Sequence, residues 1–243
     1  MTERPQLHDF RINDVAARAD AAGILVLPAS ATLIVSDLHF EKGSAYAARG
    51  QLIPPYDTRS TLRRLGECIA RHRPGRVIAL GDSFHDLGAD GRMDAEDAAG
   101  LQALVASVAN WVWIEGNHDP APPPRFGGTI LHELKLDGLI LRHLPAEQAA
   151  PGEIAGHLHP CAKVRGKGRA VRARCFATDG TRLVMPAFGA FTGGLNVCDA
   201  AFARCFGAIP DALMMGAGTV YPVSAAKLVP DRAQSRPKIT EAR

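Results

Sequence analysis

Five short apolar segments of this chain each end in a polar cluster, and this arrangement constrains the fold more than any other feature. The clusters, in chain order, are Asp37-Leu38-His39, Gly81-Asp82, Gly116-Asn117-His118-Asp119, His143 and Gly156-His157-Leu158-His159. In α/β sheets, ligands bind outside the carboxyl ends of the strands. We therefore expect the five segment ends to meet in one cleft that holds three carboxylates, five imidazoles and one carboxamide.

The residue types in these clusters suit a metal site. Imidazole and carboxylate groups together bind borderline divalent ions such as Mn, Fe, Zn or Ni, whereas Mg and Ca prefer oxygen ligands alone. Asp37 and His39 are two residues apart, as are His157 and His159, so each pair lies on one side of an extended segment. The clusters contain no cysteine, and a closed structural zinc site is therefore a poor fit. Each cluster alone could be an ordinary turn, but the order and spacing of all five favour a metal site.

The apolar pattern before residue 120 predicts strands that alternate with helices. Strands are expected at residues 23–27, 31–36, 76–80 and 111–114. Helices are expected at residues 57–72, capped by Asp57 or Thr58, and at residues 94–108. This half of the chain is typical of β-α-β units.

After residue 120 the pattern changes to hairpins. Residues 130–136 and 139–142 flank the turn Asp137-Gly138, and residues 170–177 and 182–186 flank a second turn. Mixed sheets accommodate both halves of the chain. We expect one domain over residues 1–229 and a frayed tail over residues 230–243.

Composition excludes several classes of protein. The chain has 243 residues, 47% of them hydrophobic, which is typical of a globular protein and argues against disorder. No apolar run approaches the roughly 18 residues of a membrane span, and the first 14 residues show no signal-peptide pattern. The five cysteines are odd in number and form no Cys-x-x-Cys pair, so we expect buried thiols and a reducing cytoplasm.

The net charge of +3 is unevenly distributed along the chain. Residues 161–182 contain seven Lys and Arg against one Asp, a charge of +6, which leaves -3 for the rest. Arg172 and Arg174 alternate with apolar residues, so both are expected on the solvent face of one strand. There they would follow a DNA backbone, or form a solvated face that protects an edge strand. Tyr46 and Arg49, after the first cluster, are further candidates for substrate contact.

At the five clusters the sequence resembles the calcineurin-like metallophosphoesterases, which carry Asp-x-His, Gly-Asp, Gly-Asn-His-Asp/Glu, a single His and Gly-His-x-His in this order. Residues 36–50, 51–58, 81–86 and 188–197 also resemble one bacterial subgroup, the ligase-associated DNA damage response endonucleases often called PdeM. The resemblance implies an α/β fold of two stacked mixed β-sheets flanked by helices, a four-layer αββα sandwich with two metals at one edge.

The resemblance also implies a role for each cluster residue. Asp37, His39 and His159 would hold the first metal, Asn117, His143 and His157 the second, and Asp82 would bridge the two. His118 would stand over the phosphoryl group and protonate the leaving group, and Asp119 would orient His118 through a hydrogen bond. Many members have Asp or Asn where this chain has His85. His85 and the following Asp86 are therefore candidates for substrate contact, the alternative being a polar loop.

The implied function is hydrolysis of a phosphodiester by in-line attack of metal-bound hydroxide. Two divalent ions are expected, Mn first, with Fe, Zn or Ni as alternatives. By the same resemblance the substrate would be DNA, the protein a DNA endonuclease or phosphodiesterase linked to DNA repair, and its functional neighbours a DNA ligase and a helicase. The alternative is a phosphatase or phosphodiesterase for small nucleotides or other small phosphoesters. A non-catalytic scaffold would have lost residues such as His118, and none is lost.

Overall fold

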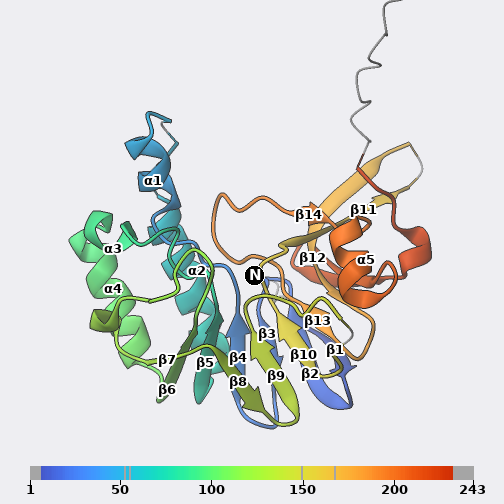
Figure 1. Cartoon of the computed structure of the whole chain (residues 1–243), viewed down its shortest axis with the longest axis horizontal. Helices are drawn as coiled ribbons and strands as arrows, with labels where there is room; N and C mark the ends of the chain where they lie inside the picture. The colour runs from blue at the N-terminus through green and yellow to red at the C-terminus, as the bar shows by residue number, and fades with distance from the viewer. Residues whose placement is uncertain (1–6, 52, 55, 149, 167, 232–243) are drawn as a thin grey trace, which may run out of the picture.

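The computed structural model describes residues 7–51, 53–54, 56–148, 150–166 and 168–231. They form an α/β fold in which two mixed sheets are stacked face to face and flanked by helices (Figure 1). The fold class expected from the sequence is confirmed.

The first sheet has the strand order β1-β2-β3-β4-β5-β6-β7. Its strands are β1 (Leu7–Ile12), β2 (Val15–Asp20), β3 (Leu25–Leu27), β4 (Thr32–Val35), β5 (Arg76–Leu80), β6 (Asn110–Ile114) and β7 (Thr129–Leu131). Strands β1 to β4 pair antiparallel, whereas β4 to β7 pair parallel. The parallel half of this sheet therefore directs the carboxyl ends of β4, β5 and β6 to one edge.

The second sheet has the order β14-β11-β12-β13-β10-β9-β8, and β15 and β16 extend it beside β12. Its strands are β8 (Glu133–Leu136), β9 (Leu139–Arg142), β10 (Glu153–Ala155), β11 (Pro160–Arg165), β12 (Ala170–Thr178), β13 (Leu183–Val184), β14 (Leu195–Asn196), β15 (Asp211–Gly216) and β16 (Thr219–Val223). Strands β9 and β10 are parallel neighbours, so their carboxyl ends also share one edge.

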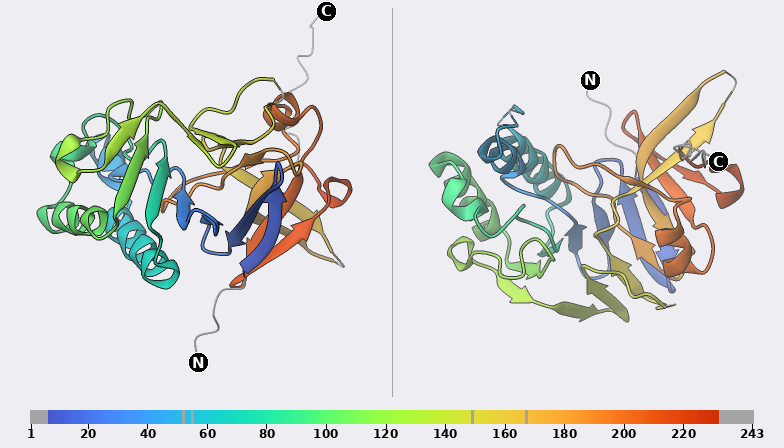
Figure 2. Two further views of the ribbon diagram at one scale, coloured as in Figure 1. Left: turned by 90° about the horizontal axis from the view of Figure 1, so that it is seen from below. Right: turned by 45° about the horizontal axis from the view of Figure 1, so that its top comes forward.

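Helices cover the outer faces of both sheets (Figure 2). Those beside the first sheet are α1 (Lys42–Ala48), α2 (Asp57–His72), α3 (Ala89–Arg92) and α4 (Ala95–Ala106), and the second sheet carries α5 (Ala200–Phe206). Two short 3-10 turns occur at Pro124–Phe126 and Ala225–Lys227. Among the described residues, no helix combines the length and apolar character that a membrane span requires.

Alternate residues of the central strands fill two different cores. Val77 and Trp113 pack toward the helices with Leu65 of α2. Ile78 and Ile114 face the second sheet. A third core joins the second sheet to Phe202 of α5. Because β5 and β6 are buried on both faces, they are continuous apolar runs in the sequence, as is usual for parallel strands.

Most predicted elements lie within two residues of their observed bounds. The predicted cap of α2 is wrong, because Tyr56 is the N-cap residue. Asp57 and Thr58 instead accept hydrogen bonds from the backbone amides of Gly43 and Glu41, and so hold the start of α1.

The single strand predicted at residues 130–136 is also wrong. The segment is divided between β7 in the first sheet and β8 in the second, so the chain crosses between sheets at His132. Four of the five free cysteines are buried, as expected, and Cys198 is half-buried. Of the predicted tail, residues 232–243 lie outside the described residues, while Asp231 forms ion pairs with Lys163 and Arg172.

Candidate functional site

The structure brings the five sequence clusters together at one edge of the stacked sheets. In the first sheet, Val35 pairs with Ala79 and Leu80 with Ile114, so β4, β5 and β6 end side by side. The clusters that follow β9 and β10 come from the facing sheet and complete the site. The convergence expected from the strand ends is therefore present.

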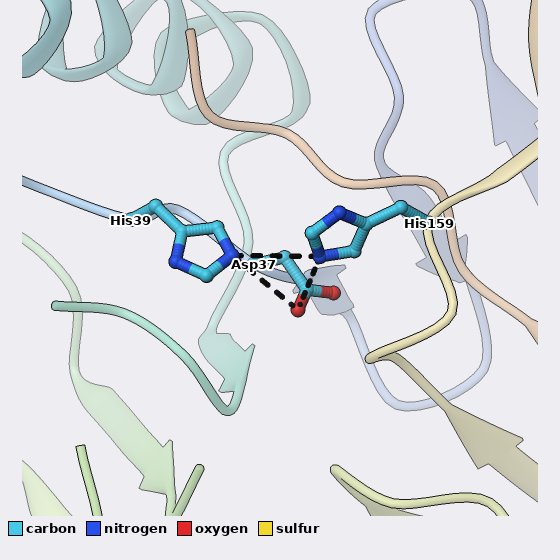
Figure 3. Close-up of side chains that lie close together, drawn as sticks. All are labelled: Asp37, His39 and His159. Atoms are coloured by element: carbon cyan, nitrogen blue, oxygen red, sulfur yellow. Dashed lines mark hydrogen bonds and ion pairs between the residues drawn. The ribbon is translucent and has the colours of Figure 1, made fainter. Parts of the chain in front are cut away.

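Asp37, His39 and His159 form the first group of metal-ligand type (Figure 3). Oδ1 of Asp37 lies 3.0 Å from Nε2 of His159 and 4.0 Å from Nε2 of His39. The two Nε2 atoms face each other across 3.4 Å. Two ring nitrogens and a carboxylate oxygen therefore converge, which is a donor set that suits a borderline divalent ion.

Asp82, His143 and His157 form the second group. Nε2 of His143 lies 3.3 Å from Oδ1 of Asp82 and 3.0 Å from Oδ1 of Asn117. Nδ1 of His143 lies 3.1 Å from the carbonyl oxygen of Leu80 and can only donate to it. That bond leaves Nε2 as the ring nitrogen available to a metal, since the partner of one nitrogen fixes the state of the other.

Asp82 lies between the two groups. Its Oδ1 faces His143, whereas its Oδ2 lies 3.9 Å from Nε2 of His39 and 4.0 Å from Nε2 of His118. The backbone amide of His118 donates to Oδ1 at 2.9 Å and fixes the carboxylate. One carboxylate thus directs an oxygen toward each group.

The backbone is strained at five of these residues. Asp37, His39, Asp82, His157 and His159 all have φ between 46° and 67°. Residues other than glycine rarely occupy this left-handed region, and each costs about 1–3 kcal/mol. Such strain is concentrated at functional sites because the surrounding structure must impose it.

Gly81 permits the close approach of His143 to the end of β5. Its φ is 75°, and an added Cβ atom would lie 2.4 Å from the His143 ring. Any side chain at residue 81 would therefore displace His143 from Asp82.

The electrostatics of the site favour a bound cation. Burial opposes ionisation of Asp82, but the hydrogen bond and charge of His143 outweigh it and hold the pKa of Asp82 at about 2. Burial also disfavours the charged form of His143, yet its hydrogen bond to Asp82 and the charge of Asp37 raise its pKa to about 8. Burial lowers the pKa of His39 to about 3 despite the two carboxylates. The ionised Asp82 and the unprotonated His39 are in the states that a divalent ion requires, whereas an ion bound by His143 must displace its proton.

The structure corrects the role predicted for Asp119. Its Oδ2 accepts hydrogen bonds from the backbone amides of Ser83 and Phe84 at 2.9 and 3.0 Å, and burial raises its pKa to about 7. His118 is oriented by another group, since its Nδ1 donates to the carbonyl oxygen of His85 at 2.9 Å. Asp119 therefore holds the loop after Asp82 rather than the ring of His118.

The candidate substrate residues near α1 are two aromatic rings, His85 and Tyr46, and two charged side chains, Asp86 and Arg49. The His85 ring stacks on that of His118 at 5.5 Å and 19°, and Tyr46 follows at 6.1 Å from His85. Asp86 forms a 2.7 Å ion pair with Arg92. Arg49 is exposed at the end of α1.

Arg172 and Arg174 do not form the predicted pair on a solvent face. Arg174 is half-buried and donates to the carbonyl oxygens of Ala187 and Gly189. Arg172 is exposed, but it binds Asp231 and the carbonyl oxygen of Gly194. Both arginines donate hydrogen bonds to carbonyl oxygens of the segment after β13. Strand alternation predicts the face on which a side chain lies but not such partners from a distant segment.

Two residues near the clusters were not singled out from the sequence. Ser36 donates from Oγ to Oδ2 of Asp37 at 2.5 Å. Burial lowers the pKa values of His39 and His85, and the charge of Lys42 at the start of α1 adds to this effect. The sequence signal for both residues is their closeness to the first cluster: Ser36 precedes Asp37, and Lys42 follows His39 by three positions.

Comparison with known proteins adds independent information. The sequence profile of the calcineurin-like phosphoesterases matches residues 31–163, a span that contains all five clusters. No curated protein matches the sequence.

Among solved structures, the chain is similar to the crystal structure of Pseudomonas putida nuclease MPE. The TM-score is 0.69 and the identity 26%, over 90% of this chain and 100% of that one. The chain also matches AQ665 from Aquifex aeolicus, a protein of unknown function, with TM-score 0.37 and 16% identity over 53% of this chain and 78% of that one. Yfce, a phosphoesterase from E. coli, gives TM-score 0.35 and 16% identity over 67% and 82% of the two chains.

Proposed function

The chain belongs to the calcineurin-like phosphoesterase family, and on this premise we propose that it cleaves phosphodiester bonds in DNA. As a family member it is a metal-dependent phosphoesterase. The finer assignment to DNA is supported by its similarity to a nuclease over 90% of its length.

The position of Asp82 between the two groups carries the proposal. In it, Asp37, His39 and His159 would hold one divalent ion, Asn117, His143 and His157 would hold the other, and Asp82 would be shared by both. The residues fit this task, because the two oxygens of Asp82 face different groups and the ring nitrogens converge on each side. Two divalent ions supply Lewis acidity to the phosphoryl group and a source of hydroxide at neutral pH. Imidazole ligands suit Fe, Zn and Ni, and carboxylate ligands suit Mn. We expect Mn in both positions, with Fe, Zn or Ni as the alternatives.

His118 supplies the proton that the leaving group needs. Its Nδ1 is engaged by the His85 carbonyl, so Nε2 is the nitrogen that faces the site, 4.0 Å from Oδ2 of Asp82. In the proposal, Nε2 donates its proton to the departing oxygen as the ester bond breaks. General acid catalysis of this kind contributes about 10²–10⁴ in rate.

The hairpin of β11 and β12 provides the positive charge expected near a DNA backbone. Strand β11 begins directly after His159, and the hairpin stands out from the body of the protein (Figure 2). Arg165 and Arg169 near its tip are exposed. These residues replace Arg172 and Arg174 as the proposed phosphate contacts.

The biological setting belongs to the same proposal. The resemblance to the PdeM subgroup supports a role in DNA repair together with a DNA ligase and a helicase. The five free cysteines support a reducing compartment such as the cytoplasm.

One observation favours small phosphoesters as the second candidate substrate. A cavity of about 540 Å³ adjoins the second group and is lined by Asn117, His143, Leu144 and His132 among others. Pockets of this size accept small molecules. A mononucleotide could therefore bind there with its phosphate toward Asp82.

A substrate panel distinguishes the two functions. The purified protein with Mn²⁺ is incubated with single-stranded DNA, duplex DNA, cyclic nucleotides and a chromogenic phosphodiester. We expect cleavage of DNA. Turnover of cyclic nucleotides without any DNA cleavage would contradict the DNA assignment and support the second candidate.

The Asp82→Asn variant tests the shared carboxylate. Asparagine offers one oxygen instead of two, so we expect activity to fall by about 10²–10³, a loss typical of removing one group that stabilises the transition state. Bound metal, measured by elemental analysis, should decrease as well. Asp90→Asn is the matched control, because Asp90 pairs with Arg125 and belongs to neither group. Full activity and full metal content in Asp82→Asn would rule out the dinuclear centre.

A further inference from the structure

The segment between β13 and β14 borders the first group of ligands. The amide of Gly189 donates to the carbonyl oxygen of Asp37 at 3.0 Å, and the amide of Leu195 donates to that of His159 at 3.0 Å. Figure 3 shows this segment in pale orange, running past Asp37 and His159. We call residues 189–195 the bordering loop. Both of its ends are fixed to backbones that carry site residues.

The bordering loop is held from several sides. The amide of Ala190 donates to Oγ1 of Thr61 at 3.2 Å, and Oγ1 of Thr192 donates to the carbonyl oxygen of Gly189 at 2.9 Å. Arg174 binds the same carbonyl from β12. A Cβ atom added to Gly189 would lie 2.2 Å from the carbonyl oxygen of Leu38, so the loop lies directly against the first cluster. Any side chain that the bordering loop exposes to solvent is therefore held on a backbone with a defined position beside the site.

What the loop presents is Phe191. This side chain is 46% exposed, whereas the other eight phenylalanines are buried or half-buried. Its φ is 53°, a left-handed conformation that is unfavourable for an aromatic residue. The fold thus keeps an aromatic ring in solvent, on a strained backbone, in a loop whose two ends bond to the backbones of Asp37 and His159. Neither burial nor a turn requirement explains a phenylalanine here, since glycine or asparagine would suit this conformation better.

We propose that Phe191 is a stacking platform for a nucleobase of the substrate, on the nucleotide that adjoins the scissile phosphate on the Asp37 side. This inference rests on the proposed function. The residues next to Phe191 are Ala190, Thr192, Gly193 and Gly194, which are too small to make the broad apolar patch that a protein partner would need. A single flat ring fits a single flat base. Aromatic stacking tolerates every base and contributes roughly 5- to 100-fold to affinity.

The platform favours an unpaired base. In a duplex, each base is already stacked and paired within the helix, and a flipped base must first give up those contacts. The Phe191 ring therefore selects single strands, loops and ends without reading their sequence.

The test uses a single-stranded oligonucleotide with one cleavable phosphodiester, the neighbouring linkages being methylphosphonates that fix the register. Abasic sites are placed one at a time on either side of the cleavable bond. For the wild-type protein, we expect one abasic position to raise KM by roughly 5- to 100-fold. In Phe191→Ala the KM for the intact strand rises by a similar factor and the same abasic site has no further effect, as expected for two partners of one contact. Phe191→Trp restores the discrimination.

Tyr221→Ala is the matched control, because Tyr221 is 50% exposed and lies on β16, which pairs with β15 and not with the strands that flank the bordering loop. It should leave KM at both positions unchanged. Equal KM values for intact and abasic strands in the wild type, or discrimination that survives in Phe191→Ala, would overturn this inference alone. A wild-type protein that cleaves no DNA would overturn the proposed function, and this inference with it.

Discussion

At the scale of the single residue, His118 differs from the buried imidazoles of the site, His39 and His143, in its exposure. Nδ1 is held by a backbone carbonyl, and the side chain is 44% exposed. The rings of His39 and His143, by contrast, are almost completely buried among carboxylates. An exposed ring with one fixed nitrogen can meet a substrate and donate a proton in a defined direction.

His118→Asn tests this role because the amide nitrogen of asparagine can still donate to the His85 carbonyl while Nε2 is lost. We expect the rate of DNA cleavage to fall by about 10²–10⁴. Hydrolysis of bis(p-nitrophenyl) phosphate should fall far less, because p-nitrophenolate leaves without a proton. The ratio of the two rates in steady-state kinetics is the measurement. Equal losses on both substrates would show that His118 acts in some other way.

Residue types at the site could be predicted from the sequence, but their partners could not. The clusters at Asp37, Asp82 and His143 follow apolar strands, a local pattern that a sequence displays directly. The hydrogen bonds of Asp119 to Ser83 and Phe84, and of Arg174 to Ala187 and Gly189, depend on loops that meet only in the folded chain. The same holds for Phe191, whose exposure and left-handed φ are properties of the loop and not of its composition.

At the scale of the element, Asp20 joins the end of β2 to the end of α2. Its side chain is fully buried, and Oδ2 accepts hydrogen bonds from Nε2 of His72 at 2.8 Å and from Arg71 at 3.0 Å. Burial opposes its ionisation, but His72, the amide of Ala22 and Arg71 outweigh burial and lower its pKa below 3.8. This contact fixes the helix that packs behind β4 and β5.

Because the pKa of Asp20 is lowered in the folded protein, the contribution of Asp20 to the free energy of unfolding depends on pH in a known sense. A carboxyl whose pKa is lower in the folded than in the unfolded protein stabilises the fold above the unfolded value, and this contribution is lost as the pH falls through the folded value. Asp20→Asn should therefore lower the free energy of unfolding at pH 7 by about 1–3 kcal/mol. The difference from wild type should shrink below pH 3.8.

Urea unfolding of metal-free protein between pH 3 and 7 measures both effects. Asp9→Asn is the control, because Asp9 pairs with Arg18 in an exposed ion pair that is expected to contribute only about 0–1 kcal/mol. A difference between Asp20→Asn and wild type that did not change with pH would contradict the assignment.

Elements with strong periodicity were predictable, whereas those defined by pairing partners were not. Helix α2 matches its apolar spacing, and β5 and β6 match continuous apolar runs. The hairpin of β1 and β2 has alternating exposure with few large apolar residues, so the sequence did not indicate it. Strands β7 and β8 are separate because β7 pairs with β6 in the first sheet and β8 pairs with β9 in the second. A run of apolar residues does not indicate which sheet each of its halves joins.

At the scale of the whole molecule, charge and shape place the basic hairpin beside the metal-ligand edge. The chain as a whole carries only +3, yet residues 161–182 carry +6. Part of this charge is used within the fold, since Lys163 and Arg172 pair with Asp231 and Arg182 forms a buried pair with Glu153. Arg165 and Arg169 form no ion pair with any described residue. Of the described part of the hairpin, these two are the charges available to a polyanion.

The double variant Arg165→Ala/Arg169→Ala should therefore change how DNA binding depends on salt. Each phosphate contact releases counterions and adds about 0.7 to the slope of log K against log salt for single strands. Loss of two contacts should reduce the slope by about 1.4. The variant Arg63→Ala/Arg73→Ala removes the same charge from exposed positions on and just after α2, and it should leave the slope unchanged.

Fluorescence anisotropy over a salt series, with Ca²⁺ in place of Mn²⁺ to prevent cleavage, provides the slopes. Equal slopes for both variants would mean that the hairpin contributes only net charge, whereas a selective loss for the hairpin variant places the DNA backbone along β11 and β12 as it leaves the site.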